Sequence, residues 1–70
     1  HVVIIPKRHI DSLLDPRAVD GTLLECMLKA VQQSAAFYQL DKLGFYVRAN
    51  AGTDGVTPHM HWHLYGPGIP

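Results

Sequence analysis

The sequence predicts an α+β fold in which one long helix packs on an antiparallel sheet. Three observations predict it: an apolar run near the start of the chain, a long segment with helical periodicity, and two later segments with strand-like composition. Their order along the chain is strand, helix, strand, strand. Because a loop joins the last two, we expect these strands to pair antiparallel, with the helix covering one face of the sheet.

The first strand is expected over residues 2–5, a β-branched run that ends at Pro6. An unbroken apolar run is typical of a strand that is buried on both faces, so we expect this strand at the centre of the sheet. Residues 10–16 predict a connector with roughly one helical turn, because Pro16 disfavours helix at the residue before it.

The helix is expected over residues 21–40. Thr22 and Glu25 have the T-x-x-E spacing of a capping box at its start. The apolar side chains then recur at helical spacing and form one stripe, which consists of Leu24, Met27, Leu28, Val31, Ala35 and Tyr38. We interpret this stripe as core or subunit interface rather than as a cofactor-binding surface.

A second strand is expected over residues 44–50 (Gly-Phe-Tyr-Val-Arg-Ala-Asn), followed by a glycine-containing turn over residues 51–55. The third strand is expected over residues 59–65 (His-Met-His-Trp-His-Leu-Tyr). Strand side chains alternate between the two faces of a sheet, so the odd-numbered positions share one face. This histidine row consists of His59, His61 and His63.

The even-numbered positions of that segment are expected to face an apolar layer. They are Met60, Trp62 and Leu64. We expect Trp62 to bury against the helix, where its indole N–H needs a hydrogen-bond partner or a position at the edge.

Composition limits the possible functions. The 70 residues allow at most one small domain, and the formal net charge is zero with neutral histidines. The basic residues do not cluster beyond Lys7-Arg8, which argues against a nucleic-acid polymer or a membrane surface as partner but leaves room for a small phosphate ligand. The single cysteine, Cys26, is expected as a buried or half-buried thiol. No signal peptide or membrane span is apparent, so we expect a cytoplasmic setting.

The histidine row permits three interpretations. One is a metal site, although the first and last histidines of a strand triplet lie ~13 Å apart at ~3.3 Å per residue, which suits an extended substrate better than one ion. The second is nucleophilic catalysis at phosphorus, in which His61 attacks, His63 hydrogen-bonds the phosphoryl oxygens or the leaving group, and His59 holds the tautomer of His61 directly or through the backbone. The third is a chance cluster on a solvated sheet face.

Three segments resemble a known family. Residues 59–65 resemble the His-φ-His-φ-His-φ-φ motif (φ, apolar) of the histidine-triad family of nucleotide hydrolases and transferases, and Pro58 precedes them as in a common form of that motif. Residues 1–10 (HVVIIPKRHI) resemble its H-hydrophobic-I-P-K-x-H-I strand, and residues 44–52 its G-Y-x-hydrophobic-x-N-x-G strand and turn. The similarity implies one histidine-triad-like domain over residues 1–70, a fragment whose N-terminal elements we expect to lie before His1.

The resemblance implies hydrolysis or transfer of a nucleoside 5′-monophosphoryl group, of the phosphoramidate or dinucleoside polyphosphate type, through a covalent nucleotidyl-histidine. His61 corresponds to the nucleophile, His63 to the histidine that contacts the α-phosphate, and His59 to the one that supports the nucleophile. His63 at the third position, where transferases of the sugar-nucleotide type have Gln, favours a hydrolase. No cofactor and no metal are expected.

Further correspondences concern substrate binding. His1 matches a fourth histidine packed behind the triad, and Asn50 matches an asparagine near the phosphate. Residues 55–58 lack the Gln and Ser of the family's G-Q-S-V-like stretch, so Thr57 is expected to replace that hydroxyl in part. His9 is similar to a family histidine outside the chemistry.

The resemblance also implies a homodimer, joined through the long helix and the strand at residues 44–50. Two alternatives stay open. One is a metal-binding metallohydrolase. The other is a non-catalytic nucleotide-binding module that has lost phosphate contacts.

Overall fold

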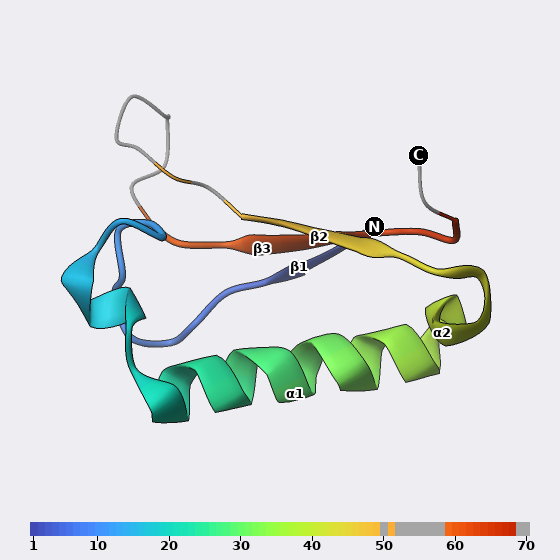
Figure 1. Ribbon diagram of the computed structural model, residues 1–70, viewed down its shortest axis with the longest axis horizontal. Coiled ribbons are helices and arrows are strands. Elements are labelled where there is room, and N and C mark those ends of the chain that lie inside the picture. The colour runs from blue at the N-terminus through green and yellow to red at the C-terminus, as the bar shows by residue number, and fades with distance from the viewer. Residues whose placement is uncertain (50, 52–58, 69–70) are drawn as a thin grey trace.

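The structure, a computed structural model, describes residues 1–49, 51 and 59–68. Within this part of the chain, strands β1 (Val2–Ile4), β2 (Tyr46–Ala49) and β3 (Trp62–Tyr65) form an antiparallel sheet. Helix α1 (Gly21–Phe37) runs along one face of that sheet, and the short helix α2 (Leu40–Leu43) follows it (Figure 1). The α+β fold with one long helix on an antiparallel sheet is therefore confirmed.

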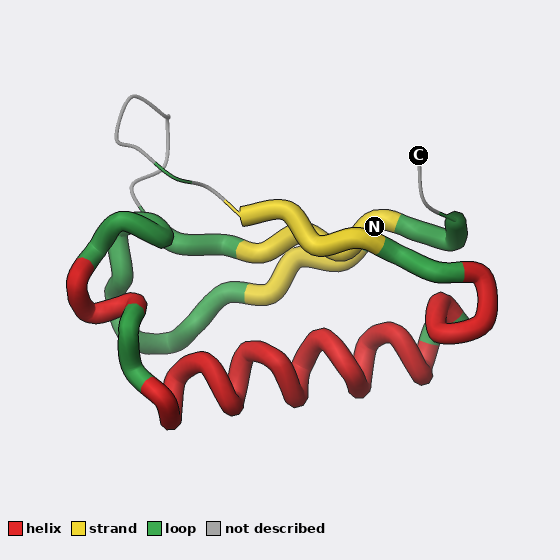
Figure 2. Tube along the Cα trace, viewed as in Figure 1, coloured by secondary structure: helices red, strands yellow, loops and turns green. Residues whose placement is uncertain are grey.

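The strand order is β1-β3-β2, so β3 lies between the other two (Figure 2). The prediction that residues 2–5 form the central strand was wrong. Within the described sheet β1 is an edge strand, and Val3 and Ile5 are 45% and 57% exposed. These two side chains lie on the face away from α1. Only part of the apolar run is therefore buried, and the rest forms an apolar surface beside the histidine row.

Cross-strand register sets which side chains share this outer face. His63 on β3 lies opposite Val3 on β1 and opposite Arg48 on β2. Tyr65 lies opposite Tyr46. Because directly opposed residues point to the same side, all of these side chains lie on the face away from α1.

The core lies between the sheet and α1. Met60 and Leu64 are fully buried, as predicted, and Met60 packs in one cluster with Ile10 and Met27. Trp62 is only partly buried but packs against the same cluster. Its indole Nε1 is buried and has no hydrogen-bond partner among the described residues, so the expected partner is not found there.

The start of α1 differs from the predicted capping box. Asp20 is the N-cap, and its Oδ1 accepts hydrogen bonds from the backbone N–H groups of Thr22 (2.9 Å) and Leu23 (3.2 Å). Thr22 is already inside the helix, and Glu25 instead pairs with Lys29 at 3.1 Å. Aspartate is at least as good an N-cap as threonine, so the N-cap is Asp20, two residues before the predicted N-cap Thr22.

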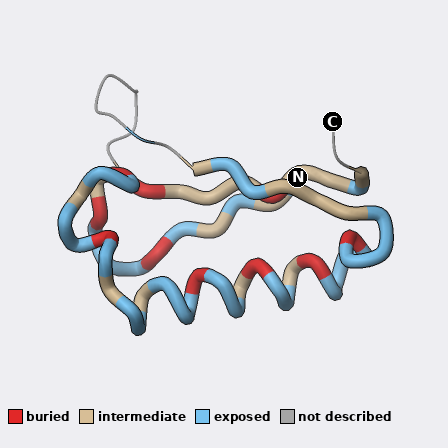
Figure 3. The backbone as a smooth tube through the Cα atoms, viewed as in Figure 1, coloured by how far each residue is buried: buried red, intermediate tan, exposed pale blue. Residues whose placement is uncertain are grey.

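The helix also ends earlier than residue 40. It stops at Phe37, and Gln39 takes a left-handed conformation (φ 58°) before α2 begins. The buried positions of α1 face the sheet (Figure 3) and are Met27, Val31 and Ala35. The rest of the predicted apolar stripe is mostly exposed: Leu24, Leu28 and Tyr38.

The helical turn expected within residues 10–16 lies later, as the short 3-10 helix η1 (Pro16–Ala18), where proline occupies a first-turn position whose N–H would have no helical partner in any case. Cys26 is exposed on α1, so the expectation of a buried or half-buried thiol was wrong. None of the helices within residues 1–49, 51 and 59–68 has the length and apolarity needed to cross a bilayer.

Candidate active site

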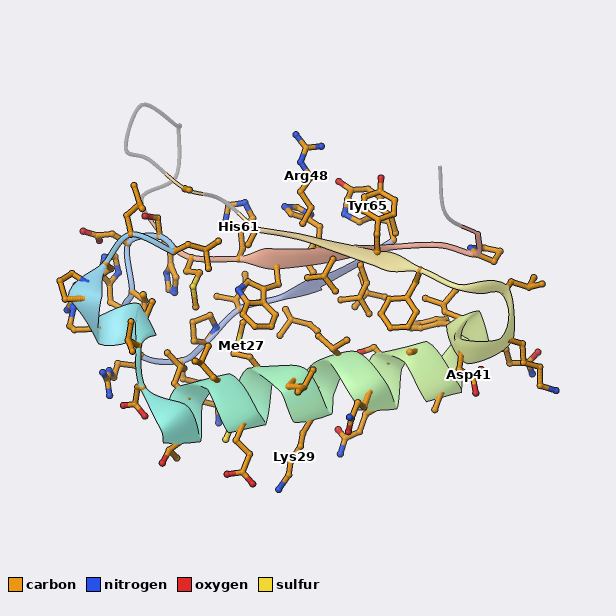
Figure 4. The ribbon with its side chains drawn as sticks, viewed as in Figure 1. Met27, Lys29, Asp41, Arg48, His61 and Tyr65 are labelled. Atoms are coloured by element: carbon orange, nitrogen blue, oxygen red, sulfur yellow. The ribbon has the colours of Figure 1, made fainter. Side chains whose placement is uncertain are left out.

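The histidine row runs along the approach to β3 and into it. His63 lies within β3, whereas His59 and His61 precede its first residue, so the strand is shorter than the predicted residues 59–65. The expected alternation of side chains still holds for His61 and Tyr65. Figure 4 shows His61, Arg48 and Tyr65 on the side of the sheet opposite α1.

The ring of His61 is held through its Nδ1 atom. This atom lies 2.8 Å from the main-chain carbonyl oxygen of His59. A carbonyl oxygen can only accept, so Nδ1 carries the proton and donates it. In this neutral tautomer the basic lone pair of the ring resides on Nε2.

The ring of His59 has a different role from its carbonyl group. Its Nε2 lies 3.2 Å from the carbonyl oxygen of Pro6 and donates to it, which ties the histidine row to the segment after β1. On its other side the ring lies 5.0 Å from the ring of His9, whose Nε2 is 2.7 Å from the carboxylate of Asp11. The hydrogen bond from His61 is thus accepted by the backbone of His59, while the His59 imidazole donates to Pro6.

His63 is linked to His1. The His1 Nε2 and His63 Nδ1 atoms are 2.8 Å apart, so one ring donates to the other. His1 is also stacked on Tyr65, with ring centroids 4.3 Å apart and planes 7° from parallel. Tyr65 in turn stacks on Tyr46 at 5.0 Å, which gives a column of three rings across the sheet beside His63.

Two hollows open on this face. The polar hollow, of about 460 Å³, is lined by Arg48, Ala49, Ala51, His61, His63 and Tyr65. The apolar hollow, of about 250 Å³, is lined by Val3, Ile5, His59 and His61. His61 lines both hollows, so a group bound at its ring has a polar surface on the β2 side and an apolar surface on the β1 side.

The charge of the polar hollow comes from Arg48. The other two arginines are paired, Arg8 with Asp20 at 3.2 Å and Arg17 with Asp15 at 2.7 Å. Among the described residues that line either hollow, none carries a carboxylate. The outer face beside His61 and His63 is therefore suited to an anion.

Two predicted substrate-binding residues, Asn50 and Thr57, lie outside the described residues. The structure brings together His59, His61, His63 and His1. It adds Arg48, Tyr46 and Tyr65, to which the sequence analysis gave no role. Alternation along residues 44–50, combined with antiparallel pairing to the histidine strand, could have placed Arg48 and Tyr46 on this face, but the sequence analysis did not use it. No group of three His, Cys, Asp or Glu side chains in the described part of the chain is placed to hold one metal ion.

Comparison with known proteins gives two relatives. The chain is 37% identical over 71 aligned residues to a protein of Chlamydia muridarum named an uncharacterized HIT-like protein. It is equally similar to a protein of the same name in Chlamydia trachomatis serovar D. Each alignment covers 99% of this chain but only 56% and 63% of the two relatives, so the chain spans little more than half of their length.

No family model matches the chain, and no solved structure matches it significantly. The sequence similarity nevertheless runs along 99% of the chain, and the fold is the helix on an antiparallel sheet that the motif implied. Its similarity to two proteins named HIT-like is consistent with a fragment of a histidine-triad (HIT) domain.

Proposed function

We propose that this chain carries the catalytic centre of a nucleotide hydrolase that cleaves nucleoside 5′-monophosphoryl linkages through a nucleotide bound covalently to His61. The observation that carries the proposal is the 2.8 Å contact between His61 Nδ1 and the carbonyl oxygen of His59. It fixes the tautomer in which Nε2 has the lone pair, on the face that holds both hollows.

In the first step, Nε2 of His61 attacks the α-phosphorus. A P–N bond forms, the bond from phosphorus to the leaving oxygen or nitrogen breaks, and the leaving group departs with that electron pair. A leaving phosphate departs as an anion, whereas a leaving nitrogen takes up a proton from solvent and departs as the neutral amine. The imidazole ring becomes positively charged because Nδ1 keeps its proton. The carbonyl oxygen of His59 stabilises this charge at 2.8 Å, as an orienting acceptor does for a catalytic histidine.

In the second step, water attacks the same phosphorus. The new P–O bond replaces the P–N bond, whose electron pair returns to Nε2 of His61, and the proton lost by the water passes to solvent. The products are the nucleoside monophosphate and the free enzyme. Hydrolysis is thus divided into two displacements, each with a good leaving group.

His63 is proposed to donate a hydrogen bond to the phosphoryl oxygens. As a neutral ring it can do so from Nε2 only if its Nδ1 accepts, which requires His1 to donate across their 2.8 Å contact. The stack of His1 on Tyr65 holds the His1 ring in the orientation of this contact. His1 therefore acts on substrate through His63.

Three further elements of the proposal come from the family resemblance. Asn50 and Thr57 are proposed as phosphate contacts, and the protein as a cytoplasmic homodimer joined through α1 and β2. The dimer is supported by apolar side chains exposed on these two elements, Leu24 and Leu28 on α1 and Val47 on β2. An aspartate at Leu28 should then shift the protein to monomer in analytical ultracentrifugation.

The test is release of a chromogenic amine from an adenosine 5′-phosphoramidate by the full-length protein. Wild type should turn over, and His61→Ala should not. Lys29→Ala serves as the control, because it changes an exposed side chain of α1 on the side of the helix away from the sheet. Rapid quenching followed by mass spectrometry should find adenylyl attached to His61.

Three results contradict the proposal. These are an inactive wild type, a His61→Ala variant with wild-type activity, and activity that disappears on treatment with a chelator.

A further inference from the structure

We propose that Arg48 binds an anionic leaving group and makes the site prefer substrates whose nucleotidyl group departs from a phosphate over those that release a neutral amine. This inference rests on the proposed function, because it names the substrate class of the same site. It concerns a residue that the histidine motif does not contain.

Arg48 is placed by the pairing of β2 with β3. It lies directly opposite His63, and both line the polar hollow with His61. Figure 4 shows its side chain extending from β2 away from α1, on the same side of the sheet as His61 and Tyr65. The guanidinium group is therefore presented on the face where phosphorus would bind.

The charge of Arg48 is uncompensated in the described part of the chain. Arg8 and Arg17 have carboxylate partners, but no described acidic side chain pairs with Arg48. The hollow itself is lined by imidazole, phenol and alanine groups, with no described carboxylate. A planar guanidinium with free donors is the side chain that best matches two phosphate oxygens.

The contrast between the two hollows indicates on which side of His61 the leaving group of the substrate would bind. Val3 and Ile5 make the β1 side of His61 apolar, whereas Arg48 makes the β2 side cationic. A charged leaving group therefore fits on the β2 side. Negative charge builds on a leaving phosphate as its bond to the α-phosphorus breaks, and a fixed cation there lowers the barrier. A neutral amine has no such charge to stabilise.

The kinetic test compares two substrates on the full-length protein: a diadenosine triphosphate, which releases ADP, and an adenosine phosphoramidate with a neutral alkylamine. Arg48→Ala should lower the ratio of kcat/KM for the triphosphate to kcat/KM for the phosphoramidate by at least about tenfold. This is the loss expected for one hydrogen bond between charged groups. Arg48→Lys should restore part of the ratio, because it keeps the charge but not the fork. Lys42→Ala removes a cation on α2, outside both hollows, and should leave the ratio unchanged.

A binding test separates this inference from the covalent mechanism. By titration calorimetry at fixed ionic strength, wild type and His61→Ala should both bind ADP more tightly than AMP, and Arg48→Ala should lose that preference. If His61→Ala is fully active, the proposed mechanism fails while the role of Arg48 is still decided by this preference. The inference is overturned if wild type binds ADP no more tightly than AMP. It is also overturned if Arg48→Ala changes neither the kcat/KM ratio of the two substrates nor the preference for ADP over AMP.

Discussion

The Nδ1 atom of His61 donates to the main-chain carbonyl oxygen of His59, two residues away, at 2.8 Å. Because of this contact, the two histidines contribute different chemical groups. His61 contributes a ring whose Nε2 carries the lone pair, while His59 contributes a backbone group that any residue at its position would also supply. The side chain of His59 instead donates to Pro6.

The first prediction follows from that separation. His59→Ala keeps the carbonyl acceptor but loses the link to Pro6 and the contact with the His9 ring, so kcat should fall by about 10- to 100-fold, as for other residues that orient a reactive group. His61→Ala removes the nucleophile and should lower kcat by at least about 10³-fold. Steady-state release of a chromogenic amine measures both. Equal losses in the two variants would show that the His59 ring acts on substrate directly.

The second prediction concerns the pair His1 and His63, whose ring nitrogens are 2.8 Å apart. His1→Phe keeps an aromatic ring to stack on Tyr65 but cannot donate to His63. If the pair acts as a unit, the double variant His1→Phe/His63→Phe should be no less active than the worse of the two single variants. The measurement is kcat/KM for wild type and the three variants. Losses that multiply would show that the two rings act independently.

The sequence correctly predicted that the histidine row and the core side chains of the same segment lie on opposite faces of the sheet. Met60 and Leu64 are buried and His61 is on the opposite side, because period-two alternation depends only on local backbone geometry. The long helix followed from its apolar spacing for the same reason. Such local rules hold wherever the chain is extended or helical.

What the sequence did not predict depends on contacts between distant residues. The apolar run at residues 2–5 became an edge strand, because strand order is set by which strands pair and not by composition alone. Arg48 acquired its place beside His63 only through the register of β2 on β3. The apolar hollow beside His61 exists because Val3 and Ile5 remain uncovered on that side.

The third prediction tests the start of α1. Asp20→Ala removes the acceptor for the N–H groups of Thr22 and Leu23 and should lower Tm by about 4 °C or more. Asp20→Asn keeps a good N-cap and loses mainly the exposed pair with Arg8, so it should be much milder. Thermal unfolding followed by circular dichroism measures both variants.

Thr22→Ala is the matched control, because Thr22 would be the N-cap of a T-x-x-E capping box. It should have little effect on Tm. A larger loss in Thr22→Ala than in Asp20→Ala would restore the capping box as the true start of the helix.

The fourth prediction concerns acid. Hydrogen bonds from the Arg17 guanidinium, followed by those from the backbone N–H groups of Asp11 and Arg17, hold the pKa of Asp15 well below its ordinary value of 3.8. A carboxyl whose pKa is lowered by folding stabilises the folded state above its unfolded pKa and loses this contribution as pH falls below it. The contribution of Asp15 to stability should therefore be constant near neutral pH and fall below about pH 4.

Urea midpoints at pH 7 and pH 3 measure this effect. Asp15→Asn should be less stable than wild type at pH 7 and should lose less stability on acidification. Part of the acid dependence should remain, because backbone hydrogen bonds, that of Leu23 first, also lower the pKa of Asp20. Glu25→Gln removes an exposed carboxylate and should keep the wild-type dependence. An unchanged acid response in Asp15→Asn would refute the assignment.

The last prediction compares two glycines. A Cβ added at Gly66, directly after β3, would lie 3.0 Å from Leu40 Cδ2, 3.2 Å from Phe45 Cβ and 3.3 Å from the carbonyl oxygen of Gly44. The nearest atom belongs to a side chain, but the other two are fixed close to the backbone, so the chain at Gly44 and Phe45 must give by a few tenths of an ångström. Gly66→Ala should lower the free energy of unfolding by about 1–3 kcal/mol.

Gly21→Ala is the opposite case. A Cβ at this first residue of α1 meets no atom within 4 Å, and alanine loses less backbone entropy on folding than glycine. It should raise the free energy of unfolding by up to about 1 kcal/mol. Urea denaturation of the two variants beside wild type gives both values. If Gly66→Ala were as stable as wild type, α2 would not be packed against the end of β3 in solution, and the close approach of Leu40 to Gly66 would not contribute to the fold.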